Sequence, residues 1–266
     1  MKDRFNRIIT YLRISVTDRC NLRCVYCMPE EGVALMPRAR MLSFEEILSI
    51  TRTAVDMGMR KVRLTGGEPL VRRDIVRLVS MLSAVHGIKD LSMSTNGVFL
   101  SQFAGPLADA GLQRVNISLD SVNPRRYAEI TRGGSLKEVL AGIDAAGRAG
   151  LEPIKLNCVI VDPPDRKDAE EVAEFGRRNG LQVRFIHRMN LAGGEFRVVE
   201  GGTGGDCPSC NRLRLSSDGM VRPCLFSDLA FSVRRLGARE AIRRAVEEKP
   251  ERGVSSLANS FYSVGG

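Results

Sequence analysis

The chain has 266 residues, of which 43% are hydrophobic and 27% charged, a balance typical of a globular protein rather than one embedded in a membrane. Its formal net charge is +9, and its opening, MKDRFNRIIT, has no apolar export segment, so we expect a cytoplasmic protein without a membrane anchor. Tryptophan is absent and aromatic residues make up only 5%, which argues against a stacking surface for single-stranded nucleic acid.

Short β-rich segments alternate with helical patterns from residue 11 to about residue 190. Strands are predicted at 11–16, 61–65, 91–95, 114–119, 154–161 and 183–187. Helices are predicted between them, for example over 43–58, which opens with a capping box, and over 135–150, which ends at a glycine. Repeated strand–helix units give a parallel sheet with right-handed crossovers. The pattern predicts an α/β fold, either a full or incomplete barrel or an open doubly wound sheet.

Residues that a hydrophobic core does not require follow these strands directly. They form a cysteine loop, GGEP at 66–69, TNG at 95–97, SLDS at 118–121 and the segment that starts at His187. Chemistry in α/β barrels and open α/β sheets gathers at the carboxyl ends of the strands. We therefore expect these segments to converge on one face, an arrangement that favours the barrel.

The first cysteine set comprises Cys20, Cys24 and Cys27. Three thiolates can hold three irons of a [4Fe–4S] cluster and leave the fourth iron open to a small chelator. The alternative is a zinc site completed by a distant residue, but neither of the two histidines has a neighbouring pair of cysteines. In GGEP, Gly66 and Gly67 would let a ligand approach the backbone, and Glu68 offers a carboxylate for an ammonium group.

The strand–helix pattern ends at Met189, and a glycine-rich connection follows. We expect two parts, residues 1–190 and residues 191–266, the second beginning with this connection and containing a basic helix over about 228–248. Arg212 and Arg214 would share one side of an extended segment. The second part carries a second cysteine set, Cys207, Cys210 and Cys224. The seventh cysteine, Cys158, lies in an apolar strand pattern and is predicted to be buried.

The first cysteine set, with Tyr26 before its last cysteine, resembles the signature of radical S-adenosylmethionine (SAM) enzymes. The resemblance implies a partial or full α/β barrel and a [4Fe–4S] cluster whose open iron is chelated by the amino and carboxylate groups of SAM. It also implies that the GGEP motif holds the methionine amine, and that one electron from the cluster releases a 5′-deoxyadenosyl radical.

The second cysteine set, in CPSCNRLRLSSDGMVRPCLF, narrows the resemblance. Together with KVRLTGGEPLVRRD and the terminal Gly265-Gly266, it resembles the GTP 3′,8-cyclase family, which acts in the first step of molybdenum cofactor biosynthesis. That family implies an incomplete (β/α)6-type barrel with a C-terminal appendage that carries a second [4Fe–4S] cluster. The expected activity is that of a lyase converting GTP to 3′,8-cyclo-7,8-dihydro-GTP.

The resemblance also assigns roles to individual residues. The contacts with SAM would come from Tyr26, Gly66, Gly67, Glu68, Ser118 and Met189. The contacts with GTP would come from Arg13, Arg63, Ser94, Lys155, Arg212 and Arg214. The last two arginines and the diglycine tail, Gly265 and Gly266, would assist catalysis, and the two cysteine sets would hold the clusters. Expected partners are a reductant protein, the enzyme of the next molybdopterin step and a second copy of the chain, with no nucleic acid or membrane.

Two features depart from this family. His187 stands where the family usually has a glutamate, and only 17 residues separate Met189 from Cys207 where the family has several dozen. A wall of the substrate cavity could therefore be missing. The alternatives are a radical SAM enzyme with an auxiliary cluster that acts on another small molecule or a peptide, and a basic zinc protein that binds nucleic acid.

Overall fold

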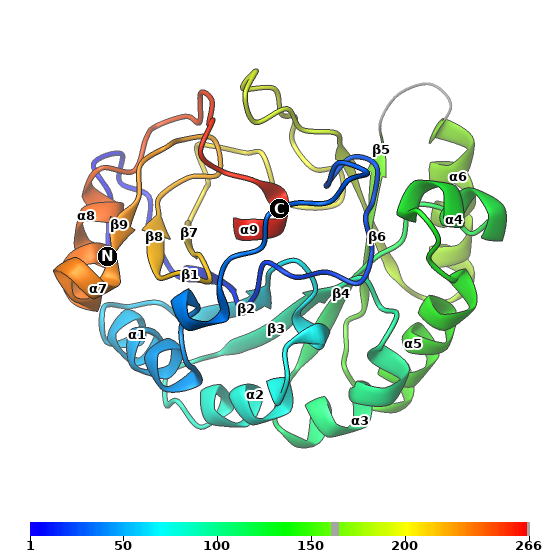
Figure 1. The fold of residues 1–266 in the computed structure, drawn as a ribbon, viewed down its shortest axis with the longest axis horizontal. Coiled ribbons are helices and arrows are strands. Elements are labelled where there is room, and N and C mark those ends of the chain that lie inside the picture. The colour runs from blue at the N-terminus through cyan, green and yellow to red at the C-terminus, as the bar shows by residue number, and fades with distance from the viewer. Residues whose placement is uncertain (161–164, 265–266) are drawn as a thin grey trace.

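The computed structural model describes residues 1–160 and 165–264, and it contains a curved sheet flanked by helices (Figure 1). Six parallel strands lie side by side in chain order. They are β1 (Tyr11–Ser15), β2 (Lys61–Thr65), β3 (Asp90–Thr95), β4 (Arg114–Ser118), β5 (Lys155–Ile160) and β6 (Gln182–His187). Each lies within one residue of its predicted bounds, and Val161, the predicted end of β5, is outside the described residues.

Helices cover the outer, convex side of these strands (Figure 1). They are α1 (Phe44–Asp56), α2 (Ile75–Ser83), α3 (Leu100–Asp109), α4 (Pro124–Thr131), α5 (Leu136–Arg148) and α6 (Asp165–Arg178), with short 3-10 turns at η1 (Arg38–Arg40) and η2 (Pro69–Val71). The predicted capping box of α1 is confirmed, because Glu46 N donates to Ser43 Oγ (3.0 Å) and Ser43 N donates to Glu46 Oε2 (2.7 Å). Within the described ranges, every helix is too short or too polar to span a bilayer.

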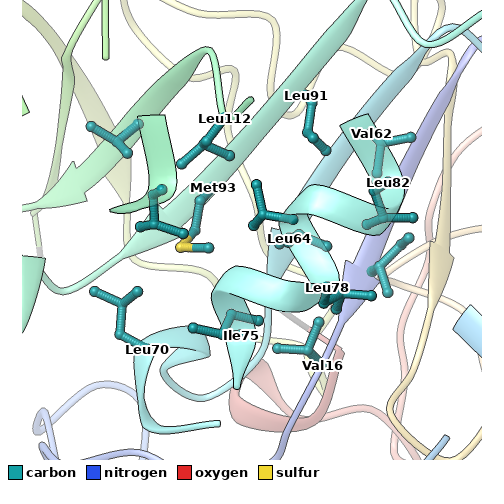
Figure 2. Packing of buried hydrophobic residues seen from close by; sticks show 14 of the residues in the cluster. Val16, Val62, Leu64, Leu70, Ile75, Leu78, Leu82, Leu91, Met93 and Leu112 are labelled. Carbon is teal, nitrogen blue, oxygen red and sulfur yellow. The ribbon is translucent and has the colours of Figure 1, made fainter. Parts of the chain in front are cut away.

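The main core lies between the strands and the outer helices. Figure 2 shows Leu64 of β2 and Met93 of β3 near Leu78 and Leu82 of α2, and all four side chains are completely buried. Successive residues of a strand point to opposite faces. Since these apolar positions face the helices, the alternate positions of the same strands face the inside of the curve. Cys158 is buried on the helix side, as predicted.

The C-terminal segment extends the sheet beyond β1. Strand β7 (Arg212–Leu215) pairs in parallel with β1, and β8 (Met220–Arg222) and β9 (Phe231–Ser232) follow in antiparallel order. Helices α7 (Val233–Leu236) and α8 (Ala238–Glu247) then pack near α1, and α9 (Phe261–Val264) lies against β1. This segment therefore continues the sheet of the barrel, whereas the sequence suggested an appendage resting against it.

The connection between β6 and β7 folds back over the open edge of β6. Phe185 forms an antiparallel bridge with Glu200, and Asn190 forms another with Glu195. A Cβ atom on Gly205 would fall within 3.0 Å of the Arg197 carbonyl oxygen, so this segment needs its glycine for close backbone packing. The short connection, residues 188–211, is thus folded against β6 rather than extended, and we call it the strap.

Candidate functional site

The inner face of the sheet and the strap enclose a cavity of about 330 Å³. All six residues that the sequence assigned to GTP line it, although they come from five different strands: Arg13, Arg63, Ser94, Lys155, Arg212 and Arg214. Met189 and the whole second cysteine set, Cys207, Cys210 and Cys224, line the same cavity. The structure therefore brings the predicted substrate residues and the second cysteine set into one site.

The cavity carries an excess of positive charge. Sequence reasoning missed four further cations that line it, Lys61, Arg114, Arg184 and Arg197. The acidic residues on its wall are Asp90 and Asp206, and Asp90 is paired with Arg114 at 2.6 Å. Burial and then the neighbouring charge of Arg212 lower the pKa of Arg214 to about 10. Buried guanidinium groups crowded in this way favour a polyanionic ligand, since phosphate oxygens accept their hydrogen bonds in pairs.

The alternation of side chains between the two faces of a strand could have identified the cations that lie on strands. Lys61 is two positions before Arg63 on β2, so its side chain shares the inner face. Arg184 and Ile186 stand in the same relation on β6, and both line the cavity. Arg197 belongs to the strap, for which the sequence offered no periodicity.

The first cysteine set lies on the loop that follows β1. Its three cysteines are half-buried, and Cys27 N donates to the Cys24 carbonyl oxygen (2.9 Å). Two N–H groups point at the Cys20 sulfur, from Leu22 N (3.4 Å) and from Asn96 Nδ2 (3.8 Å). Burial raises the pKa of all three thiols, that of Cys27 to about 12. Three thiols on one loop, one of them already accepting N–H groups, fit the ligand set of an iron–sulfur cluster.

No three histidine, cysteine, aspartate or glutamate side chains of the described residues are placed to ligate one metal ion. In a cubane cluster each thiolate binds a different iron atom, so its ligands stand further apart than those of a single ion.

The GGEP motif packs against the cysteine loop. Gly67 N donates to the Thr17 carbonyl oxygen (2.8 Å), and Glu68 N donates to that of Arg19 (2.7 Å). A Cβ atom on Gly66 or Gly67 would lie within 3.0 Å of a backbone oxygen of this loop. The two glycines therefore accommodate the protein's own backbone, and their contact with a ligand stays a prediction.

The Glu68 carboxylate is almost completely buried and joins two segments, its own and the end of β3. It accepts hydrogen bonds from Leu70 N (3.0 Å), from the Thr95 hydroxyl (2.7 Å) and from Asn96 N (2.6 Å). Burial raises its pKa to about 7, although these hydrogen bonds act in the opposite direction. In the described conformation this side chain holds the ends of β2 and β3 together, and its contact with a cofactor remains a prediction.

Tyr26 connects the cysteine loop to the ends of β4 and β5. Its hydroxyl donates to Asp120 Oδ2 (2.7 Å), and Asp120 Oδ1 accepts from Val159 N (2.8 Å). Burial, with the adjacent Asp120 carboxylate, raises the pKa of Tyr26. Asp120 lies two residues after Ser118, the last residue of β4, and it is a positioning contact that the sequence reasoning did not single out.

The strap supplies the wall that the sequence suggested could be missing. Phe196, Arg197 and Val199 of the strap line the cavity, and the ring of Phe196 lies 4.4 Å from that of Phe226. His187 Nε2 lies 3.0 Å from a carboxylate oxygen of Glu200, so a glutamate of the strap comes beside the histidine. A cavity wall is therefore present despite the short connection.

The C-terminal helix reaches the inside of the sheet (Figure 1). Arg214 Nη1 donates to the Val264 carbonyl oxygen at 3.5 Å. Gly265 and Gly266, which the sequence placed at the active site, lie outside the described residues. The chain just before them nevertheless contacts a cavity arginine.

Comparison with known proteins identifies the superfamily and the fold. Residues 14–176 match the model of the radical SAM superfamily. The structures of Streptococcus suis SuiB bound to precursor peptide SuiA (19% identity, 71% of this chain, 41% of that chain, TM-score 0.58) and of native anSMEcpe with bound AdoMet (15%, 91%, 81%, 0.64) share the fold. At these identities the likeness concerns the fold alone.

Curated relatives match over nearly the whole chain. The GTP 3′,8-cyclase of Thermodesulfovibrio yellowstonii is 40% identical over 305 residues (94% of this chain, 95% of the relative), and that of Listeria monocytogenes serotype 4b is 40% identical over 309 residues (97% and 93%). The GTP 3′,8-cyclase of Alkaliphilus metalliredigens aligns in full over 321 positions against 266 residues here, so 55 positions have no counterpart in this chain. The chain belongs to the GTP 3′,8-cyclase family of the radical SAM superfamily.

Proposed function

We propose that the protein is a lyase that converts GTP to 3′,8-cyclo-7,8-dihydro-GTP, the first step of molybdenum cofactor biosynthesis, in the cytoplasm. One observation carries this proposal. The six residues assigned to GTP come from strands spread along the chain, yet all of them line a single cationic cavity together with the second cysteine set. A triphosphate supplies the negative charge that such a cavity requires.

The radical end of the site lies at the first cysteine set. Membership of the superfamily implies a [4Fe–4S] cluster and SAM, and Cys20, Cys24 and Cys27 would hold that cluster. When bound, the cluster and SAM together would supply a one-electron cleavage of SAM that yields a 5′-deoxyadenosyl radical able to abstract hydrogen from the substrate. Around SAM we place Tyr26, Gly66, Gly67, Glu68, Ser118 and Met189. The hydrogen bond between Tyr26 and Asp120 fixes the loop that carries this set.

The substrate end lies at β7 and the second cysteine set. Arg212 and Arg214 alternate with buried leucines, so both guanidinium groups face the cavity and can bind phosphate oxygens in pairs. Arg13 and Lys155 approach from β1 and β5, where they orient the triphosphate. Cys207, Cys210 and Cys224 would hold a second [4Fe–4S] cluster, and with only three protein ligands it would have an iron available to the guanine base. We also propose that Gly265 and Gly266 assist catalysis.

An anaerobic reconstitution experiment tests the proposal. We expect about eight irons per chain, formation of 5′-deoxyadenosine that depends on GTP, and a cyclised product of the same mass as GTP, read by mass spectrometry. Cys20→Ala should abolish SAM cleavage. SAM cleavage that is indifferent to GTP but responds to a peptide or another small molecule would transfer the assignment to that substrate class.

A binding experiment separates the two ends of the site. Arg212→Ala and Arg214→Ala should each weaken GTP binding about 10–100-fold while the radical cluster stays intact, because each removes a charge-assisted contact. Arg148→Ala, an exposed arginine at the end of α5, is the matched control and should bind GTP normally. Equal GTP affinity in all three variants would contradict the assignment.

The proposed partners are a reductant protein, the enzyme of the next molybdopterin step and a second copy of the chain.

A further inference from the structure

Lys249 is almost completely buried, with 2% of its surface exposed, which is rare for a lysine. It begins the segment KPERG (249–253), which follows α8. Its Nζ donates to the carbonyl oxygen of Arg212 (2.9 Å) and to that of Pro223. Arg212 lies two residues after Cys210, and Pro223 immediately precedes Cys224. One ammonium group thus joins the two chain segments that carry these cysteines.

A buried ammonium group needs nearby negative charge, because the loss of its hydration is costly. The two carbonyl oxygens that accept from Lys249 satisfy two of its three N–H donors. Both carbonyls belong to the stretches that carry Cys210 and Cys224, so the buried ammonium group lies beside residues that we propose as cluster ligands. Negative charge on a cluster held by these cysteines would offset the cost of burying it.

The rest of the KPERG segment wraps the same cysteine set. Arg7 donates to the carbonyl oxygen of Cys207 (2.9 Å) and to those of Pro250 (2.7 Å) and Glu251 (2.8 Å), so it fixes the segment to the third cysteine. At Gly253, an added Cβ atom would lie 3.1 Å from the Cys224 sulfur and 2.6 Å from Phe226 Cβ. The segment thus contacts the stretches of Cys210 and Cys224 directly and is linked to Cys207 through Arg7, and its glycine keeps the space beside Cys224 open.

We propose that Lys249 is a positioning residue for the second cysteine set. Its ammonium group holds the segments of Cys210 and Cys224 together and compensates the negative charge of the thiolates when they bind a [4Fe–4S] cluster. This inference rests on the proposed second cluster. Without the ammonium group, two carbonyl oxygens lose this donor and the cluster loses a buried cation beside two of its cysteine-bearing stretches, which lowers both its retention and its reduction potential.

The test compares Lys249→Met, which keeps the length and apolar stem of the side chain, with Lys137→Met, an exposed lysine on α5. Both variants and the unchanged protein are reconstituted anaerobically, and iron loss to a chelator and the midpoint potential of each cluster are measured without substrate. In Lys249→Met the second cluster should lose iron about 10–100-fold faster and titrate at a lower potential, while the first cluster is unchanged. Lys137→Met should match the unchanged protein.

Three outcomes would overturn the inference. Retention and potential of the second cluster unchanged in Lys249→Met would show that the lysine only fills space. If that variant does not fold, Lys249→Arg, which keeps the charge, and Lys249→Gln, which does not, replace it, and equal iron loss in both would remove the role of the charge. About four irons in the unchanged protein would remove the second cluster itself, and with it this part of the proposed function.

Discussion

Replacing Gly67 by alanine should separate the GGEP motif from the cysteine loop. The new Cβ atom would fall within 3.0 Å of backbone oxygens of Asp18 and Arg19, which are backbone atoms that cannot rotate away. Relieving this overlap costs about 1–3 kcal/mol. The same movement strains the hydrogen bonds from Gly67 N to Thr17 O and from Glu68 N to Arg19 O, each worth about 0.5–1.5 kcal/mol. We therefore expect Gly67→Ala to lower the free energy of unfolding by about 2–6 kcal/mol.

Urea denaturation of the cluster-free protein measures this loss without interference from bound iron. Gly147→Ala is the matched control, because Gly147 lies inside α5 and an added Cβ atom meets only Ile154 Cδ1, at 4.0 Å. Alanine is the better helix former, so this control should gain about 0.5–1 kcal/mol. The reasoning fails if Gly67→Ala loses less than about 1 kcal/mol, or if both variants change in the same direction.

Three further changes test other contacts of the site. Burial raises the pKa of Glu68 to about 7, so the native state binds this proton more tightly than the unfolded chain does, and stability should fall as pH rises from about 5 to 7. Glu68→Gln should remove about 3 kcal/mol of that fall, and parallel pH profiles in urea would contradict this. Tyr26→Phe should cost about 1.5–3 kcal/mol in thermal unfolding, because the buried Asp120 carboxylate loses a donor, and a loss below about 0.5 kcal/mol would argue against the contact. Glu200→Ala should change stability by less than about 1 kcal/mol, since this carboxylate is 62% exposed in its pair with His187, and a larger loss would show that the strap depends on that pair.

The central strands could be read from the sequence because they obey a local rule. Each of β1 to β6 is a short run of β-branched and apolar residues between helical patterns, and its bounds differ from the prediction by at most one residue. The start of α1 could also be predicted from the sequence, since the side chains of Ser43 and Glu46 each accept a hydrogen bond from the other's backbone N–H group. Where a segment's own residues determine its conformation, the sequence is enough.

The C-terminal strands depend on distant partners and were not predicted. β7, β8 and β9 have four, three and two residues, too few to show a period, and β7 forms by pairing with β1, about 200 residues earlier in the chain. Residues Lys61 and Arg184 were missed for a related reason. An arginine or lysine on a strand is usually solvated, and only closure of the sheet around the cavity gives these two side chains a common neighbourhood.

The pairing of β7 with β1 sets the distance between the two cysteine sets. Cys210 precedes β7 and Cys20 follows β1, so the two sets are attached at opposite ends of the same pair of parallel strands. Each of these strands is four or five residues long, roughly 13–17 Å. The strap, which contains the short connection, is not part of this strand pair. A change in the length of the connection would therefore leave the pairing of β7 with β1, and the separation that it sets between the two cysteine sets, unchanged.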